Sequence, residues 1–408
     1  MDNYTETNYT GYGQNIGNSF KGMFVGLVLL IGSMVLIWWN EGRSVTQANA
    51  LEEMQKKIHL LSAPVYDALL EGKPVLVQGE VTPTQRVMDT EFEVSTDGLV
   101  LQRTVEMYQW KETTHSHSKD TLGGGTETVT TYEYSKTWSK HPIDSSFFKH
   151  RSGHENPPMN YHSATFSSPA MLGDFHLDKG MIEHISANIP YDGLAKMPQK
   201  IGAVTNYKQF LYLGENPASP KVGEIKIIYT YAPSGVYTFA GKESGKRLVP
   251  YRTSNGKALV FVRKGRVTAE KIFKEELDAN STLTWVLRVA GLSLMFIGFS
   301  LIMEPLQTFA KVIPALGSLV GGVTGVIAGI LTLILGSLII AIAWMGARPM
   351  LSLGLIGGGV VIAFLLGKFG KKTSAKSHFK KSATATSHRH PATSATPPPR
   401  KSTPPPRV

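Results

Sequence analysis

Histidines form the densest group of potential metal ligands in this chain of 408 residues. His115 and His117 are two residues apart on an expected strand, which puts both rings on one face, and His150 and His154 follow. Histidine is the commonest metal ligand in proteins. However, residues 113–126 are typical of an exposed hairpin tip, and neighbouring Gly and Pro residues do not fit a helix through the second pair. We therefore predict neither a metal nor a cofactor site, and interpret these histidines as solvated or structural.

Arg288 is a charge inside an expected membrane span, and such a charge is a functional-site hypothesis by default. It could serve permeation or bind a lipid headgroup. Alternatively, its long side chain could reach the outer membrane interface beside Trp285. Glu304 closes the other end of the same span. No further charge lies within a span, so the sequence lacks the proton-relay chain of a pump.

Composition excludes several classes of function. The chain has no Cys, which rules out a disulfide scaffold, thiol catalysis and Cys-based zinc sites. It also lacks a Gly-x-Ser-x-Gly elbow, a phosphate-binding loop and a helical metal motif, so we predict that it is not an enzyme. The tail 368–408 has ten Lys or Arg and no acid, while residues 44–280 have 27 basic and 27 acidic side chains. This charge distribution argues against a nucleic-acid-binding domain, because such a domain would carry its own basic face.

Long uncharged runs identify a membrane protein. We predict four transmembrane helices over 22–39, 283–303, 317–344 and 349–367, with an interfacial piece over 306–316. Lysines cluster directly after the last run, which places the tail in the cytoplasm. With four spans, the N-terminus is then cytoplasmic too. We expect disordered cytoplasmic tails over 1–21 and over 368–408, the second being basic and Pro-rich, with polyproline II character.

Residues 44–280, between spans one and two, are predicted to form a large β-rich domain outside the cytoplasm, in a periplasm or an organelle lumen. Residues 99–111 and 127–138 are rich in Val, Thr, Tyr and Trp and predict a hairpin with a long arm. Apolar residues at helical spacing predict juxtamembrane helices after span one and over 269–277. The expected fold class is an α+β membrane protein with four transmembrane helices and this β-rich extracytoplasmic domain.

Glycines recur every four residues in the spans, which favours close helix packing. We predict that these stripes mediate either packing within one subunit or an oligomer interface. The residues are Gly317, Gly321, Gly325 and Gly329 in span three, Gly354 and Gly358 in span four, and Gly22 and Gly26 in span one.

Several motifs occur in one order along the chain. They include Gly22-Met23-Phe24-Val25-Gly26, Asn40-Glu41-Gly42-Arg43, Val105-Glu106-Met107-Tyr108-Gln109-Trp110, Glu215-Asn216-Pro217, and Thr284-Trp285 with Leu287-Arg288. Together they resemble the transmembrane protein 43 family, also called LUMA. The resemblance covers roughly residues 20–370 in the same order. It implies a four-span protein of the endoplasmic reticulum and inner nuclear membrane in animals that self-associates and organises membrane proteins such as emerin, as well as lamins. The tail from Thr373 departs from the animal members and, with the missing Cys, fits a bacterial cytoplasmic membrane, where those partners would not exist.

Three hypotheses of function follow. The first is a non-enzymatic, self-associating membrane scaffold that contacts membrane lipid and other membrane proteins but no nucleic acid. The second is an ion-conducting channel subunit built from the Gly-rich spans, and the third is a lipid-handling membrane protein. Bilayer currents that vanish on Arg288→Ala would favour the channel, and lipid that co-purifies in stoichiometric amounts would favour lipid handling.

Overall fold

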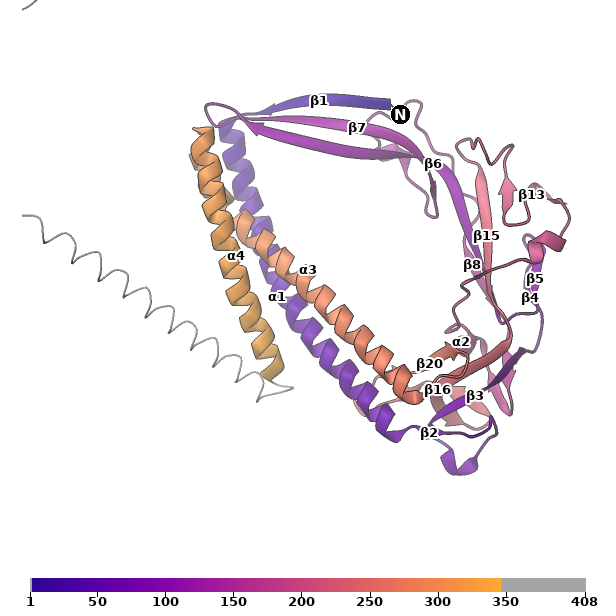
Figure 1. The fold of residues 1–408 in the computed structure, drawn as a ribbon. Coiled ribbons are helices and arrows are strands. Elements are labelled where there is room, and N and C mark those ends of the chain that lie inside the picture. The colour runs from indigo at the N-terminus through magenta and orange to yellow at the C-terminus, as the bar shows by residue number, and fades with distance from the viewer. Residues whose placement is uncertain (1, 346–408) are drawn as a thin grey trace, which may run out of the picture. The chain divides into compact units, whose positions relative to one another are not determined.

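Three long apolar helices dominate the computed structural model, which describes residues 2–345 (Figure 1). They are α1 (Tyr12–Lys57), α3 (Ala269–Ala310) and α4 (Pro314–Met345). Each is long and apolar enough to cross a membrane. The expected fourth span over 349–367, its Gly354 and Gly358, and the basic tail lie outside the described residues.

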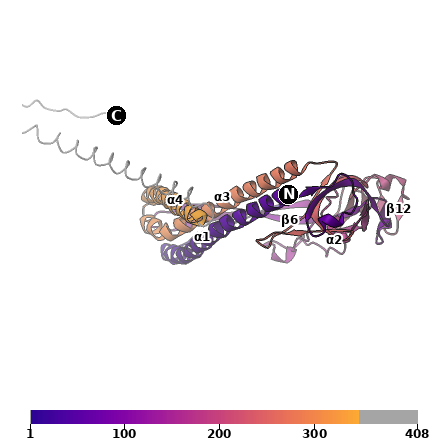
Figure 2. The same ribbon diagram turned by 90° about the horizontal axis from the view of Figure 1, so that it is seen from below.

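Both expected juxtamembrane helices are present, but they are continuous with the apolar runs. In α1 the helix runs on past the apolar segment to Lys57, and Leu51 and Met54 on this extension are fully buried. At the start of α3 the Thr268 hydroxyl accepts a hydrogen bond from the Lys271 N–H at 3.4 Å and caps the helix. Helices α1 and α3 lie side by side (Figure 1 and Figure 2).

The expected interfacial piece over 306–316 is corrected. Helix α3 continues through Pro305 to Ala310, and α4 begins at Pro314 after only three residues. Proline is well tolerated at the first position of a helix, because its missing N–H has no helical partner there. The piece is therefore the end of one helix and the start of the next.

The N-terminal residues also differ from the expected disordered tail. Strand β1 (Asp2–Thr10) pairs antiparallel with β7 (Thr126–Ser139) over nine residues, and α1 begins two residues later. Its Thr and Tyr residues suit a strand. The sequence did not show that the edge of β7 is open and pairs with this segment.

The predicted hairpin is confirmed as β6 (Val100–Asp120) and β7, the core of a nine-stranded sheet. Beyond Met107, β6 pairs only with β7, so β1, β7 and this part of β6 form a three-stranded extension that we call the arm. The main path of this sheet continues through β15 (Ile225–Ala232), β14 (Leu211–Leu213), β13 (Val204–Asn206) and β12 (Lys200–Ile201), and β8 (Ala164–Ser167) and β11 (Ile189–Pro190) pair at its side.

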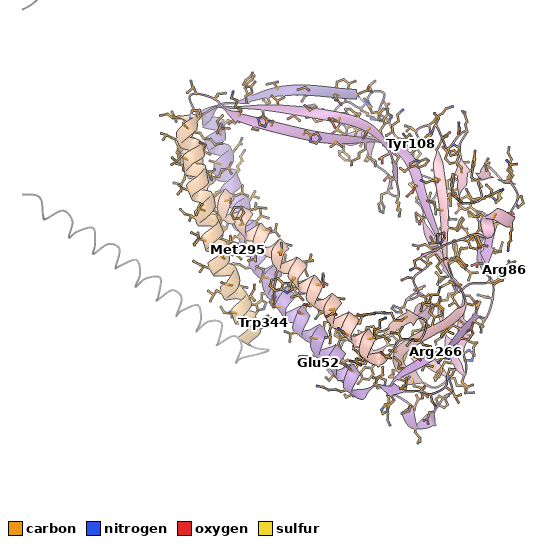
Figure 3. All side chains as sticks on the ribbon, in the orientation of Figure 1. Glu52, Arg86, Tyr108, Arg266, Met295 and Trp344 are labelled. Carbon is orange, nitrogen blue, oxygen red and sulfur yellow. The ribbon has the colours of Figure 1, made fainter. Side chains whose placement is uncertain are left out.

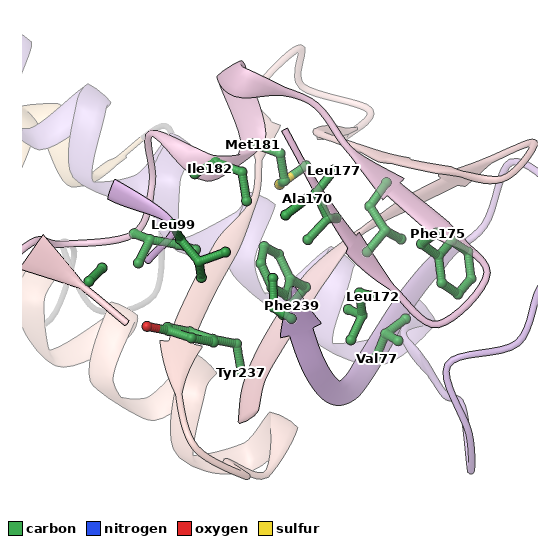
Figure 4. Close-up of a cluster of buried hydrophobic side chains, with 14 of the residues drawn as sticks. Val77, Leu99, Ala170, Leu172, Phe175, Leu177, Met181, Ile182, Tyr237 and Phe239 are labelled. Carbon is green, nitrogen blue, oxygen red and sulfur yellow. The ribbon is translucent and has the colours of Figure 1, made fainter. Parts of the chain in front are cut away.

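A second sheet closes on itself. Its strand β3 (Pro74–Pro83) pairs with both β9 (Ala170–Leu172) and β16 (Gly235–Ser244), and β10 (Phe175–Leu177) and β17 (Arg247–Val249) complete the circle. Aromatic and aliphatic side chains fill it, among them Phe175, Tyr237 and Phe239 (Figure 4). The remaining strands are β2 (His59–Leu60), β4 (Val87–Asp89), β5 (Val94–Thr96), β18 (Tyr251–Arg252), β19 (Ala258–Leu259) and β20 (Phe261–Lys264), and the remaining α-helix is α2 (Lys179–Ile182).

One cluster of buried side chains joins this closed sheet to the helices. Leu51 and Met54 of α1 and Phe273 of α3 pack with Leu76 of β3 and Phe261 of β20. A common apolar core resists relative motion, because separating the parts would expose it to water. The β-rich domain and the helix pair are therefore one packed body.

The tip of the arm contacts the far end of the helices. The Gly123 N–H donates to the Val312 carbonyl at 3.2 Å, and Lys311 pairs with Asp120 at 3.3 Å. Asn15 near the start of α1 donates to the Gly124 carbonyl at 2.9 Å. The arm therefore reaches the connection between α3 and α4.

Candidate functional site

Arg288 forms a buried ion pair with Glu41, across the interface between α3 and α1. The Arg288 Nε lies 2.6 Å from one carboxylate oxygen and a terminal guanidinium nitrogen lies 2.7 Å from the other. Glu41 is 1% exposed and Arg288 is 9% exposed. Two parallel hydrogen bonds between these groups are the strongest form of such a pair. Arg288 therefore faces a carboxylate between two helices and is not free to extend into solvent.

Aromatic side chains enclose the ion pair. Trp344 lies at the end of α4 (Figure 3). Its indole N–H donates to the second Glu41 oxygen at 2.5 Å, which brings this end of α4 to the pair. The Arg288 guanidinium lies 4.8 Å from the centre of the Trp285 ring and 5.5 Å from that of Trp344. Both rings can stabilise the cation through their faces. Three helices therefore meet at one pair of charges.

A hydrogen-bond network centred on Arg43 continues from the ion pair toward the β-rich domain. Arg43 donates to the side-chain oxygens of Asn280 at 3.0 Å, Thr284 at 3.0 Å and Asn40 at 3.3 Å. Asn40 in turn donates to the Thr284 backbone carbonyl at 3.0 Å. The Asn-Glu-Gly-Arg motif thus faces α3 with every polar side chain that it carries.

The glycine stripes divide between internal packing and an open face. A Cβ added at Gly26 would lie 2.7 Å from the Gly298 carbonyl oxygen, so these two glycines let α1 and α3 touch. Gly317 and Gly321 face Lys311 and Gln307, and Gly329 only approaches Phe296. A Cβ at Gly325 would meet nothing within 4 Å. Internal packing therefore accounts for the stripe in α1, but not for Gly325.

One feature of the sequence indicates the ion pair. Glu41 and Arg43 are close in sequence and opposite in charge, but Glu41 has its partner on another helix. Glu41 lies at the end of the first apolar run, and Arg288 lies near the start of the second, which returns antiparallel. Opposite charges at matching depths of two antiparallel helices are the pattern to look for.

The histidines of the β-rich domain take structural or exposed positions. His154 is 2% exposed, stacks on Tyr134 with ring centres 4.0 Å apart, and bonds the His150 carbonyl through Nδ1 at 2.9 Å. His115 and His117 lie exposed on the arm. Among the described residues, no group of His, Cys, Asp or Glu is arranged to hold a metal ion.

A second ion pair is buried between β4 and the nine-stranded sheet. Arg103 lies 2.9 Å from Asp89, and both side chains are less than a tenth exposed. The Tyr229 hydroxyl donates to Asp89 at 2.6 Å, and burial raises the pKa of this tyrosine far above its usual range. The network fixes β4 against β6 and β15.

Glu243 on β16 is a buried carboxyl with an incomplete set of partners. One oxygen accepts the Asp67 N–H at 3.1 Å, and the other is buried without a partner among the described residues. Burial raises the pKa of Glu243 above its usual value, and nearby Glu71 and Asp67 raise it further.

This raised pKa predicts the sign of a pH effect. A carboxyl whose pKa is higher in the folded than in the unfolded protein stabilises the fold at low pH, and that stabilisation is lost as pH rises through the folded pKa. We expect Glu243→Gln to raise the melting temperature at pH values above that pKa and to flatten its dependence on pH. Thermal unfolding of both proteins across a pH series measures this. An unchanged pH profile would contradict the assignment.

Taken together, the described residues define a membrane protein with three apolar helices, of which α1 and α3 share one core with a β-rich domain. The sequence profile described as Transmembrane protein 43 matches residues 107–349, and the chain belongs to this family. Transmembrane protein 43 of Rattus norvegicus is 32% identical over 358 residues, covering 83% of this chain and 88% of the relative. That of Homo sapiens is 31% identical over 376 residues, covering 88% and 92%. The Drosophila melanogaster homolog is 27% identical over 346 residues, covering 82% and 91%. No solved structure gives a significant match.

Proposed function

We propose that the protein is a non-enzymatic membrane scaffold that self-associates and organises other membrane proteins. The shared core supports this role, because a partner held by the β-rich domain is then held at a fixed position relative to the helices. The membrane that it serves is that of the endoplasmic reticulum and inner nuclear envelope in an animal host, or the cytoplasmic membrane in a prokaryote.

The observation that carries the proposal is the open edge of the arm. The outer edges of β1 and of β6 beyond Trp110 have no neighbouring strand among the described residues. Tyr108 and Trp110 still bond Glu224 and Asn156 through their backbone groups. An open edge presents unpaired backbone N–H and C=O groups, which bind an extended segment of another protein as an added strand. Crosslinking in native membranes from a photoreactive residue at Ser118, followed by identification of the captured protein, tests this role directly.

Self-association is tested by a pair of glycine variants. Gly325 faces open space on α4, so Gly325→Leu fits the single subunit and should interfere only with a neighbouring copy. We expect a folded protein of lower mass, measured by size-exclusion chromatography with light scattering in detergent. An unchanged particle mass would remove Gly325 from any subunit interface.

Gly26→Leu is the matched control. Its side chain would collide with the backbone of α3 at Gly298, so we expect loss of the folded helix pair, seen as aggregation in the same measurement. If both variants behave alike, the distinction between an internal and an external glycine face is wrong.

The surroundings of Arg288 give little support to the alternative of an ion channel. Its charge is paired with Glu41 and enclosed by two Trp rings, whereas a charge that guides ions must face a water-filled path. The scaffold therefore remains the first proposal.

A further inference from the structure

Residues 64–73, which we call the strap, cross one end of the closed sheet. Tyr66 and Leu70 of the strap pack on the apolar cluster inside that sheet (Figure 4). Pro64 lies so close that a Cβ added at Gly79 of β3 would be 3.1 Å from its ring, and one at Gly173 would collide with its carbonyl oxygen. The strap therefore covers apolar side chains that would otherwise face water.

Both ends of the strap are tied to turns at this end of the sheet. The Asp174 N–H, between β9 and β10, donates to the Pro64 carbonyl at 2.9 Å. The Gly245 N–H, between β16 and β17, donates to the Glu71 carboxylate at 2.8 Å. Between these two ties, the Asp67 N–H donates to the carboxylate of Glu243 at 3.1 Å. The middle of the strap thus depends on a single buried acid.

Glu243 points into the sheet from β16. Side chains alternate along a strand, and Glu243 shares a face with Tyr237 and Phe239 of the apolar cluster. Its side chain is fully buried, and its second carboxylate oxygen has no partner among the described residues. Burial of a carboxylate with one hydrogen bond and no cation is unfavourable. The strap is therefore closed most firmly when Glu243 is neutral.

The charged groups of the strap add to this effect. Burial raises the pKa of Glu243, and the nearby Glu71 and Asp67 carboxylates raise it further, although the Asp67 N–H acts in the opposite direction. Tyr66 also lies within electrostatic reach of Glu243. Lys73 accepts the Glu243 N–H through its carbonyl, but its side chain is exposed. The strap thus brings two acids to Glu243 and no paired cation.

The neighbouring strands do not supply a cation either. Glu243 stands opposite Leu248 of β17, and the adjacent Arg247 pairs with the exposed Asp178. Asp174 adds a third acid at this end and accepts the Tyr66 N–H at 3.3 Å. The other charged or titratable side chains on these strands lie on the outer face or in the exposed turn: Lys242, Lys246 and His176.

We infer that the strap is a pH-dependent lid: protonated Glu243 keeps it closed over the end of the sheet, and ionised Glu243 favours its opening. Opening brings the carboxylate into water and separates it from Asp67 and Glu71. It also uncovers the apolar side chains beneath Tyr66 and Leu70. This local opening is independent of the scaffold role proposed above.

Low pH favours the closed strap. Because the pKa of Glu243 is raised in the closed state, closure is most stable below the ordinary pKa of a glutamate and weakens as pH rises through the raised pKa. Above the raised pKa the opening equilibrium reaches a plateau. A pKa raised by one unit makes opening about tenfold more favourable on that plateau.

Hydrogen exchange of the full-length protein in detergent, followed by mass spectrometry over a pH series, measures this opening. Observed rates are divided by the intrinsic rate at each pH to give protection factors, and residues 235–241 of β16 serve as the internal reference. We expect the protection of residues 64–73 to fall with rising pH and then level off, while that of β16 stays constant. Constant protection of the strap, or a parallel fall in β16, would overturn the inference.

Two variants assign the effect to Glu243. Glu243→Gln is neutral at every pH, so the protection of its strap should not change with pH. Glu71→Gln removes one neighbouring negative charge, so the fall in protection should occur at lower pH and become smaller. A dependence on pH that persists in Glu243→Gln, or an unshifted fall in Glu71→Gln, contradicts the assignment.

Asp174→Asn is the matched control. It weakens a different tie of the same strap, the bond from the Tyr66 N–H, and leaves Glu243 in place. We expect protection of the strap to be lower by the same factor at every pH, with the dependence on pH of the wild type retained. Loss of that dependence in Asp174→Asn would show that Asp174, and not Glu243, controls the strap.

Discussion

Replacing Arg288 with alanine is expected to lower the free energy of unfolding by about 3–5 kcal/mol, because the Glu41 carboxylate would remain buried without its cation. The Trp344 N–H is too weak a partner to neutralise a full charge. Thermal unfolding in detergent, followed by circular dichroism, should show a melting temperature lowered by several degrees.

The double variant Glu41→Gln with Arg288→Met separates charge from packing. It removes both charges, keeps an acceptor for Trp344 and fills similar volume, so it should recover most of the lost stability. If the double variant is as unstable as Arg288→Ala, the ion pair matters through its shape and its hydrogen bonds and not through charge balance.

Asp89→Ala is expected to destabilise the β-rich domain by a similar amount, about 3–5 kcal/mol, because it leaves the Arg103 guanidinium and the Tyr229 hydroxyl without their buried acceptor. Glu91 lies 2.6 Å from Arg103 and is partly exposed. It remains as a partner for the guanidinium, so we expect a loss of stability near the lower end of this range. Fluorescence of Trp110 and Trp138 during unfolding reports on this sheet.

Asp97→Ala is the matched control on the same domain. Asp97 pairs with Arg86 at 3.2 Å, but both side chains are more than 60% exposed, and such pairs contribute at most about 1 kcal/mol. Equal losses in the two variants would show that burial does not decide the value of these ion pairs.

The sequence predicted those elements whose signal is local. Apolar runs located α1, α3 and α4, and β-branched and aromatic residues located β6 and β7. The sequence predicted a helix around Leu51 and Met54 from their spacing, but not that this helix is continuous with the apolar run that ends at residue 39.

Features that depend on distant partners could not be predicted. The Glu41–Arg288 pair joins residues 247 positions apart, and β1 becomes a strand only because the edge of β7 is open. A sequence shows the secondary-structure preference of each residue, but not the distant residues with which it pairs or packs.

The shared core of the helix extensions and the closed sheet also decides where the molecule can be cut. Apart from β1, the strands begin near residue 59 and end near residue 264, but a fragment with those limits would lose Leu51, Met54 and Phe273. Leu76 and Phe261 would then face water, and the fragment would be prone to aggregate. A fragment that keeps this core must begin within α1 and end within α3, so the border between the apolar runs and the β-rich domain passes through two unbroken helices.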